Sequence, residues 1–305
     1  MFRRRRHETA LLAPNAPHSY QASLTALEAS KPRIASALRK ADARRAERLA
    51  GYLDGMRLRG LEQLYAYLDA AVKSYASLPA IADLAFLVGR VRADFQTALE
   101  ATLSGYQSVA GDAMRDVMEI EALLLDFAAN PSNAQEWLEA DRARRWAKYR
   151  PEKVRNRLSA AGIKPFSDKG FEPLDYWAHS TALHVTPTES AMTARGPEAE
   201  DPTGLLADVG FVEMFEHGNR IMTAIELLRV VALGAPDDYQ PLTPRDDFDD
   251  AYARTNQMQI MMVAFTSGPD ALRETLGREP TTVELLQYVR DEIEAKSLPF
   301  GCPQQ

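Results

Sequence analysis

Apolar residues recur every three or four positions along most of the chain, a spacing that places them on one face of an α-helix. This pattern predicts helices over residues 24–49, 53–75, 81–99, 106–128, 151–162, 176–184 and 206–233. Almost no segment shows the alternation of apolar and polar residues that is typical of a half-buried strand. We therefore predict an all-α fold, a multi-helix bundle with more than about 60% of its residues in helices, against an average of roughly 30–35%.

Prolines and glycines divide this pattern into separate helices. The first segment places six apolar residues on one face, namely Leu24, Leu27, Ile34, Leu38, Ala41 and Leu49. Pro32 marks a helix start or a kink within that segment. The fourth segment ends at Asn130-Pro131, because a proline disfavours the helical conformation of the residue before it. Pro151 and Gly162 lie at the start of a short helix and just past its end.

The chain divides into three parts. The expected parts are a disordered basic arm over residues 1–20, a helical core domain over 21–235 with a long loop at 185–205, and a smaller C-terminal helical segment over 236–305. In the last part, Thr243 and Pro244 predict a helix start with a capping hydroxyl and a proline in the first turn, and Asp246 adds a favourable acid. Thr281 and Glu284 have the spacing of a capping box.

Charge is unevenly distributed along the chain. The first 50 residues contain eleven Lys or Arg and four Asp or Glu, a net +7 in a chain of −7, so the remainder carries −14. Within them, Arg3, Arg4, Arg5 and Arg6 form a run that could contact nucleic-acid phosphates, and a solvated disordered tail is the alternative. The acidic remainder argues against a nucleic-acid-binding surface over the whole protein.

Several classes of protein are excluded by what the sequence lacks. No apolar run approaches the roughly 18–20 residues of a membrane-spanning helix, and Glu8 and Pro14 stand where a signal peptide needs an apolar stretch. A single cysteine, Cys302, excludes an internal disulfide framework and a cysteine-rich zinc site. There is no glycine-rich phosphate loop, and no His-Glu-x-x-His or Glu-x-x-His motif. We expect a cytoplasmic protein with no cofactor, no metal and no membrane contact.

Polar residues in two of the predicted helices are the candidates for chemistry. Arg115 and Glu119 are four positions apart in a helix with large apolar neighbours, so they share one face. Tyr176, Ser180 and His184 share a face of a later helix in the same way. Charged groups in such surroundings lie at a rim or are paired in a partly buried network. We expect Arg115 and Glu119 to lie within side-chain reach of Ser180 or His184.

This part of the chain resembles a family of bacterial all-helical proteins related to the HEPN-like fold. The resemblance rests on the two motifs above, on the Trp-rich charged helix between them and on the following Thr186-Pro187. The resemblance covers about residues 110–187 and implies RNA or nucleotide binding in abortive infection, a bacterial defence against phage. The candidate catalytic residues that it implies are Arg115, Glu119 and His184, and the candidate binding residues are Tyr176, Ser180 and the run Arg3–Arg6.

The ribonuclease motif of that family is absent. Active HEPN ribonucleases carry an arginine followed, after four to six residues, by a histidine on the same helix, where the guanidinium binds phosphate and the imidazole assists attack by the ribose 2′-hydroxyl. None of the five histidines has an arginine at that distance, so whether the chain is an enzyme stays open. The expected partner is a nucleic acid or nucleotide. The alternative is a non-catalytic helical scaffold that binds another protein or a second copy of itself, with the polar residues stabilising its core.

Overall fold

The computed structural model describes residues 19–53, 55–163, 166, 205–236, 238–281, 284, 287, 288 and 291. Helices make up 83% of these residues and no strand occurs among them. The prediction of an all-α, multi-helix fold is therefore confirmed.

Helix limits follow the local signals in the sequence. The helices are α1 (Tyr20–Ser30), α2 (Pro32–Tyr52), α3 (Met56–Ser77), the short 3-10 helix η1 (Ala82–Leu84), α4 (Ala85–Ser104), α5 (Gln107–Ala129), α6 (Ser132–Glu139), α7 (Arg142–Tyr149), α8 (Pro151–Ala160), α10 (Leu205–Ala232) and α11 (Asp246–Leu276). Pro32 and Pro151 are each the first residue of their helix, and α5 ends directly before Asn130-Pro131. Gly162, just past α8, has the left-handed φ of +75° that favours glycine.

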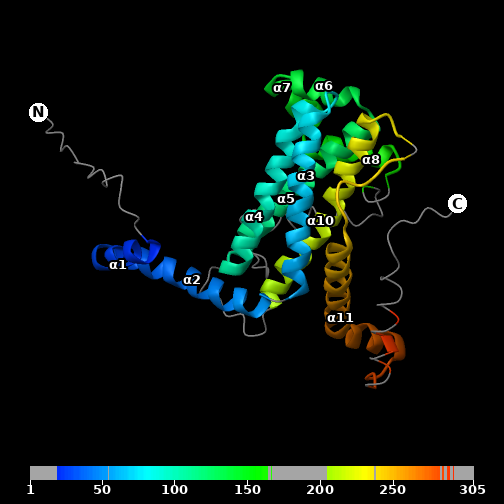
Figure 1. Cartoon of the computed structure of the whole chain (residues 1–305). Coiled ribbons are helices and arrows are strands. Elements are labelled where there is room, and N and C mark those ends of the chain that lie inside the picture. The colour runs from blue at the N-terminus through cyan, green and yellow to red at the C-terminus, as the bar shows by residue number, and fades with distance from the viewer. Residues whose placement is uncertain are drawn as a thin grey trace, which may run out of the picture.

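Helices α3, α4, α5 and α10 form the main bundle, and α11 packs along α3 and α10 (Figure 1). The largest fully buried side chains of the core are Tyr67, Tyr75, Phe95, Phe127, Phe211, Phe215 and Phe248. Helices α6, α7 and α8 lie toward one end of the bundle, whereas α1 and α2 project from the opposite end as a helical hairpin. Within the described part of the chain, the hairpin therefore contacts the bundle at its base.

This projection leaves the first predicted apolar face only partly buried. Leu24 and Ala41 are buried. Ile34 is 54% exposed, and Leu38 and Leu49 are each 39% exposed. The reason is that the N-terminal half of α2 extends beyond the bundle, so α1 is the element that packs against it.

Polar contacts hold the hairpin together and fix its base. The Tyr20 hydroxyl donates to Asp42 at 2.8 Å, which joins α1 to α2. At the base, Arg48 donates to the carbonyl of Thr102 at the end of α4. The Tyr52 hydroxyl donates to Asp208 in the first turn of α10 at 3.0 Å, and Arg57 binds the same carboxylate. The hairpin is thus attached to both α4 and α10.

Helix α11 begins later, and is capped differently, than predicted. Its first residue is Asp246, and the preceding Arg245 makes no capping bond through its side chain. The backbone N–H of Phe248 instead donates to the side chain of Gln63 on α3 at 2.7 Å. A tertiary contact therefore takes the place of the expected cap from Thr243. Further along, the predicted capping box is confirmed, because Thr281 and Glu284 exchange side-chain to backbone hydrogen bonds of 2.8 and 3.3 Å.

A close approach of α4 and α10 gives a test of the packing. A Cβ at Gly210 would lie 2.5 Å from the Thr102 Oγ1 and 2.7 Å from its Cγ2. We expect Gly210→Ala to lower the free energy of unfolding by about 1–3 kcal/mol, because overpacking outweighs the better helix propensity of alanine. Chemical denaturation followed by circular dichroism measures this change.

Gly89 in α4 provides the matched control, because a Cβ there would meet no atom within 4 Å. Gly89→Ala should raise the free energy of unfolding by about 0.5–1 kcal/mol. Equal stabilisation by the two substitutions would contradict the close contact between α4 and α10.

Candidate functional site

Arg115 and Glu119 form an ion pair along α5, as their spacing predicted. Arg115 Nε lies 3.4 Å from Glu119 Oε1, and the two side chains are 26% and 32% exposed. Tyr176, Ser180, His184 and Arg3–Arg6 lie outside the described residues. The proximity of Arg115 and Glu119 to Ser180 or His184 therefore stays a prediction.

The polar face that begins at Arg115 continues along α5 to Asp126. Arg157 of α8 binds both oxygens of the Asp126 carboxylate, at 2.9 and 2.8 Å, and Asn133 donates to it at 3.1 Å. The bond to Asp126 raises the pKa of Arg157. Asp126 is buried, so this bidentate pair supplies the partner that a buried carboxylate needs. The C-terminal half of this polar face is therefore where α8 attaches to α5.

Apolar and aromatic contacts position Arg157 for that bond. Val154 and Leu158 on α8 are buried against the core. The Arg157 guanidinium lies 5.2 Å from the ring centroid of Tyr149, and its Nη1 donates to the carbonyl of Lys148 at 2.6 Å. Arg157 thus joins the end of α7 to α5, and its role is structural.

A second group of polar residues lies between α5 and α10, and sequence reasoning missed it. Glu121 is buried on α5 and accepts a bond from Arg220 of α10 at 3.1 Å. One turn earlier on α10, the fully buried imidazole of His217 lies 3.2 Å from Glu213. The spacing Glu213-x-x-x-His217, which places both side chains on one face of the helix, was the available signal. The Glu121–Arg220 pair gives no signal in the sequence, because its two residues are 99 positions apart.

The geometry of this second group favours a structural role over a catalytic one. A general acid or base must come within hydrogen-bond reach of the substrate, and the His217 imidazole has no exposed surface. One ring nitrogen already faces the Glu213 carboxylate. Glu121 and Arg220 form a charge-assisted pair that joins two packed helices.

Two carboxyl groups come together on the outer side of α4 and α5. Arg90 binds both oxygens of Asp116, and Asp94 lies against the same carboxylate. Partial burial, the hydrogen bond with Asp116 and the charges of Asp116 and Asp112 raise the pKa of Asp94 to about 7. Near neutral pH, a protonated Asp94 therefore donates to Asp116, and loss of this proton places two like charges side by side.

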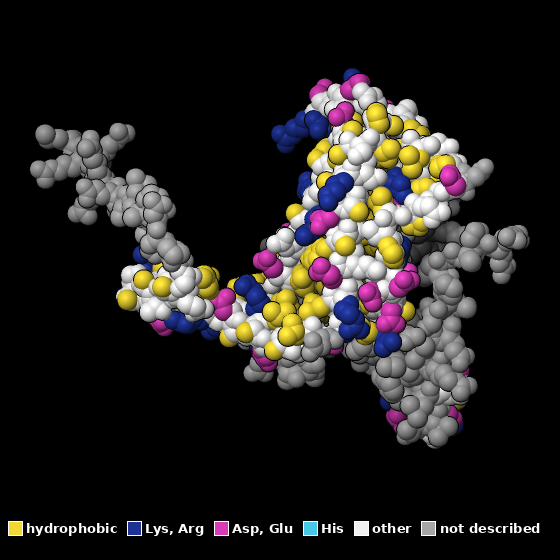
Figure 2. Space-filling view, viewed as in Figure 1, with side chains coloured by type: hydrophobic (Ala, Val, Ile, Leu, Met, Phe, Trp, Pro, Cys, Tyr) yellow, Lys and Arg dark blue, Asp and Glu magenta, His cyan; other side chains and the backbone are white. Residues whose placement is uncertain are grey.

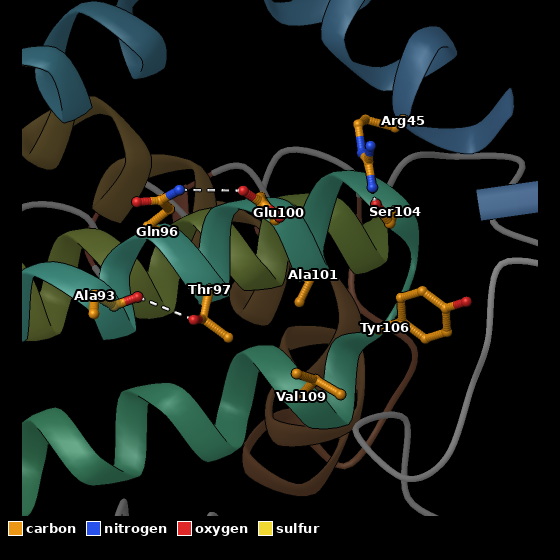
Figure 3. Close-up of a pocket in the computed structure, with 9 residues that line it drawn as sticks. All are labelled: Arg45, Ala93, Gln96, Thr97, Glu100, Ala101, Ser104, Tyr106 and Val109. Carbon is orange, nitrogen blue, oxygen red and sulfur yellow. Dashed lines mark hydrogen bonds between the residues drawn. The ribbon is translucent and has the colours of Figure 1, made fainter. Parts of the chain in front are cut away.

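An open groove of about 490 Å³ lies on α4 and the start of α5 (Figure 3). Its lining consists of Arg45, Ala93, Gln96, Thr97, Glu100, Ala101, Ser104, Tyr106 and Val109. Arg45 reaches from α2 and donates to the Ser104 hydroxyl at 3.0 Å, so the base of the hairpin forms one end of the groove. The groove combines exposed apolar side chains with the carboxylate of Glu100.

Over the described part of the chain, no three His, Cys, Asp or Glu side chains are arranged to hold a metal ion. None of the helices seen there has an apolar stretch long enough to cross a membrane. Comparisons with protein-family models, with curated proteins and with solved structures give no match. The HEPN-like relationship therefore stays a prediction.

The two arginines of the α5 polar face should differ in their contribution to stability. Arg157→Ala leaves Asp126 buried without its main partner, so we expect a loss of about 3–5 kcal/mol in the free energy of unfolding. Arg115→Ala removes one member of a partly exposed pair and should cost about 1 kcal/mol or less. Urea denaturation of both variants measures the difference. A loss for Arg115→Ala as large as that for Arg157→Ala would contradict this division.

The carboxyl pair predicts a pH-dependent contribution to stability. The folded-state pKa of Asp94, about 7, lies above the unfolded value of roughly 3.9, so its contribution is complete below pH 4 and is lost as the pH rises through 7. Asp94→Asn should therefore stabilise the protein at pH 8, by on the order of 1 kcal/mol after allowance for solvent screening of this partly exposed group, and not at pH 4. Denaturation at both pH values tests this, with Asp69→Asn as an exposed control on α3. A uniform effect of Asp94→Asn across pH would contradict the shared proton.

Proposed function

We propose that the protein is a non-catalytic helical scaffold that binds a protein partner through the α1–α2 hairpin. The observation that carries this proposal is the exposure of large apolar side chains on a hairpin attached to the bundle at its base. Several large apolar side chains exposed along one element favour an interaction site, because leaving them in water is unfavourable.

The exposed apolar residues follow the length of α2. They are Ile34, Leu38 and Leu49 on α2, and Leu53 directly after its last residue. The first and last are 19 positions apart, which corresponds to roughly 28 Å along a helix. Figure 2 shows hydrophobic side chains interspersed with Lys and Arg along the hairpin. This length suits the docking of a partner helix or of a helix-lined groove.

The polar residues of the bundle support the scaffold half of the proposal. Asp126 and Glu121 are paired across helix contacts with Arg157 and Arg220. Such pairs join neighbouring helices and satisfy buried charge, which is the role that a structural network has in a helical core.

RNA or nucleotide binding in bacterial defence is the second candidate function. It is favoured by the resemblance to the HEPN-like family and by the partial exposure of the Arg115 guanidinium, a group that can bind phosphate. In this case the α5 face, and not the hairpin, would be the binding surface.

Site-specific photo-crosslinking in cells tests the proposal. We expect a photo-crosslinking phenylalanine analogue in place of Ile34 to form a protein adduct, because this side chain lies in the partner interface. The same analogue at Phe86, which is 56% exposed on α4 toward the other end of the bundle, is the control. Leu38→Asp should abolish the adduct while leaving the melting temperature unchanged.

Other outcomes separate the two candidates. RNA bound by the purified protein, lost in Arg115→Ala and kept in Leu38→Asp, would favour the second candidate. A protein adduct no stronger at position 34 than at position 86 would contradict the binding role of the hairpin.

A further inference from the structure

We infer that the partner of the hairpin is a second copy of this chain, whose groove between α4 and α5 receives the basic, apolar side of α2. This inference rests on the proposed function and names its partner. Three observations carry it: the surplus positive charge of the hairpin, the acidic character of the groove's surroundings and the position of the groove at the base of the hairpin.

The hairpin carries a surplus of exposed positive charge. Its described part, residues 19–53, contains seven Lys or Arg and three Asp or Glu. All three acids are already bound within the hairpin, Glu28 by Arg39, Asp42 by Tyr20 and Arg45, and Glu47 by Arg44. Lys31, Arg33 and Lys40 are exposed, and in the described part of the chain no carboxylate lies within ion-pair distance of them.

Exposed apolar and basic side chains occur together on the outer half of α2. Arg33 and Lys40, seven positions apart, lie on one line along the helix. Ile34 lies about 100° around the helix from Arg33, Leu38 lies farther around in the same direction, and both are exposed. One edge of the exposed surface of α2 is therefore basic and the other edge is apolar.

The surface around the groove has the complementary character. Glu100 lines the groove, and Asp112 lies on α5 one turn beyond the exposed Val109. Nearby on α5, Asp116 is bound by Arg90, so the negative charge of this surface comes from Glu100 and Asp112. Exposed Tyr106 and Val109 provide apolar surface for Ile34 and Leu38 of another copy. The −14 charge beyond residue 50, against +7 before it, gives the same complementarity over the whole chain.

The position of the groove permits a reciprocal contact. Arg45 belongs to α2 and also lines the groove, so the donor surface and the acceptor surface meet at the base of the hairpin (Figure 3). Two copies related by a two-fold axis can then place each hairpin in the groove of the other. Such an isologous arrangement closes at two copies and uses each surface once.

Charge reversal with cross-rescue tests the inference in the full chain. Wild-type protein should be a dimer in sedimentation velocity and light scattering, and higher salt should weaken the dimer because exposed charges are screened. The hairpin variant Arg33→Glu/Lys40→Glu and the groove variant Glu100→Lys/Asp112→Lys should each self-associate at least tenfold more weakly. Their melting temperatures should match that of the wild type, because all four side chains are exposed.

An equimolar mixture of the two variants is the decisive measurement. In that pair, the reversed hairpin meets the reversed groove and the native hairpin meets the native groove, so a heterodimer of wild-type affinity is expected. A structural effect of either substitution would not be rescued by mixing.

Failure of this inference can be told apart from failure of the proposed function. A wild-type chain that is monomeric at about 100 μM, well above the dissociation constants of specific interfaces, overturns the second-copy partner. So does a dimer that the groove variant leaves intact, or one that mixing does not restore. If position 34 then still forms an adduct with a different protein, the proposed function stands without the dimer, whereas loss of that adduct contradicts both.

Discussion

The structure depends on three carboxylates of α5, each of which binds an arginine from a different neighbouring helix. Asp116 binds Arg90 of α4, Glu121 binds Arg220 of α10 and Asp126 binds Arg157 of α8. Glu121 and Asp126 are buried, and because a buried carboxylate without a partner is costly, their pairs favour one alignment of the helices that they join. The Asp116–Arg90 pair lies at the surface and contributes less. Apolar packing brings α4, α8 and α10 against α5, and these pairs select the register in which they pack. The central helix is thus fixed on three sides.

The hairpin, unlike the bundle helices, is held by neighbouring helices at one end. Its base is attached through Arg48 to α4 and through Tyr52 to Asp208 of α10, a carboxylate that Arg57 of α3 also binds. Among the described helices, α1 is the one that packs along the outer half of α2, where Ile34 and Leu38 remain exposed. Because these contacts fix the base of the hairpin, its exposed apolar side chains are presented in a defined arrangement. Such preorganisation lowers the entropy cost of binding, which distinguishes this surface from a frayed helix end.

Features that depend on neighbours in the sequence were predictable, and features that depend on the fold were not. Helix period, the proline starts of α2 and α8, and the capping box at Thr281 are local, so the sequence predicts them directly. The exposure of Ile34 was not predictable, because it depends on where the bundle ends. The bond from Phe248 to Gln63, which replaces the expected cap of α11, joins residues far apart in the chain. The same applies to the candidate site: the spacing showed a polar face at Arg115 and could not show which helix covers the rest of it.

Charge explains how an exposed apolar hairpin can be selective. Apolar surface alone attracts any other apolar surface, whereas Arg33 and Lys40 beside Ile34 and Leu38 add a condition on the partner. A basic or neutral partner that buried these cations would leave their charge without compensation, and the free-energy cost of that burial opposes binding. An acidic partner offsets that cost, and the groove that Glu100 lines, with Asp112 beside it, offers this on the chain itself. In the proposed interface, the opposite charges of the two regions therefore favour an acidic partner surface, and another copy of the chain carries such a surface at equal concentration.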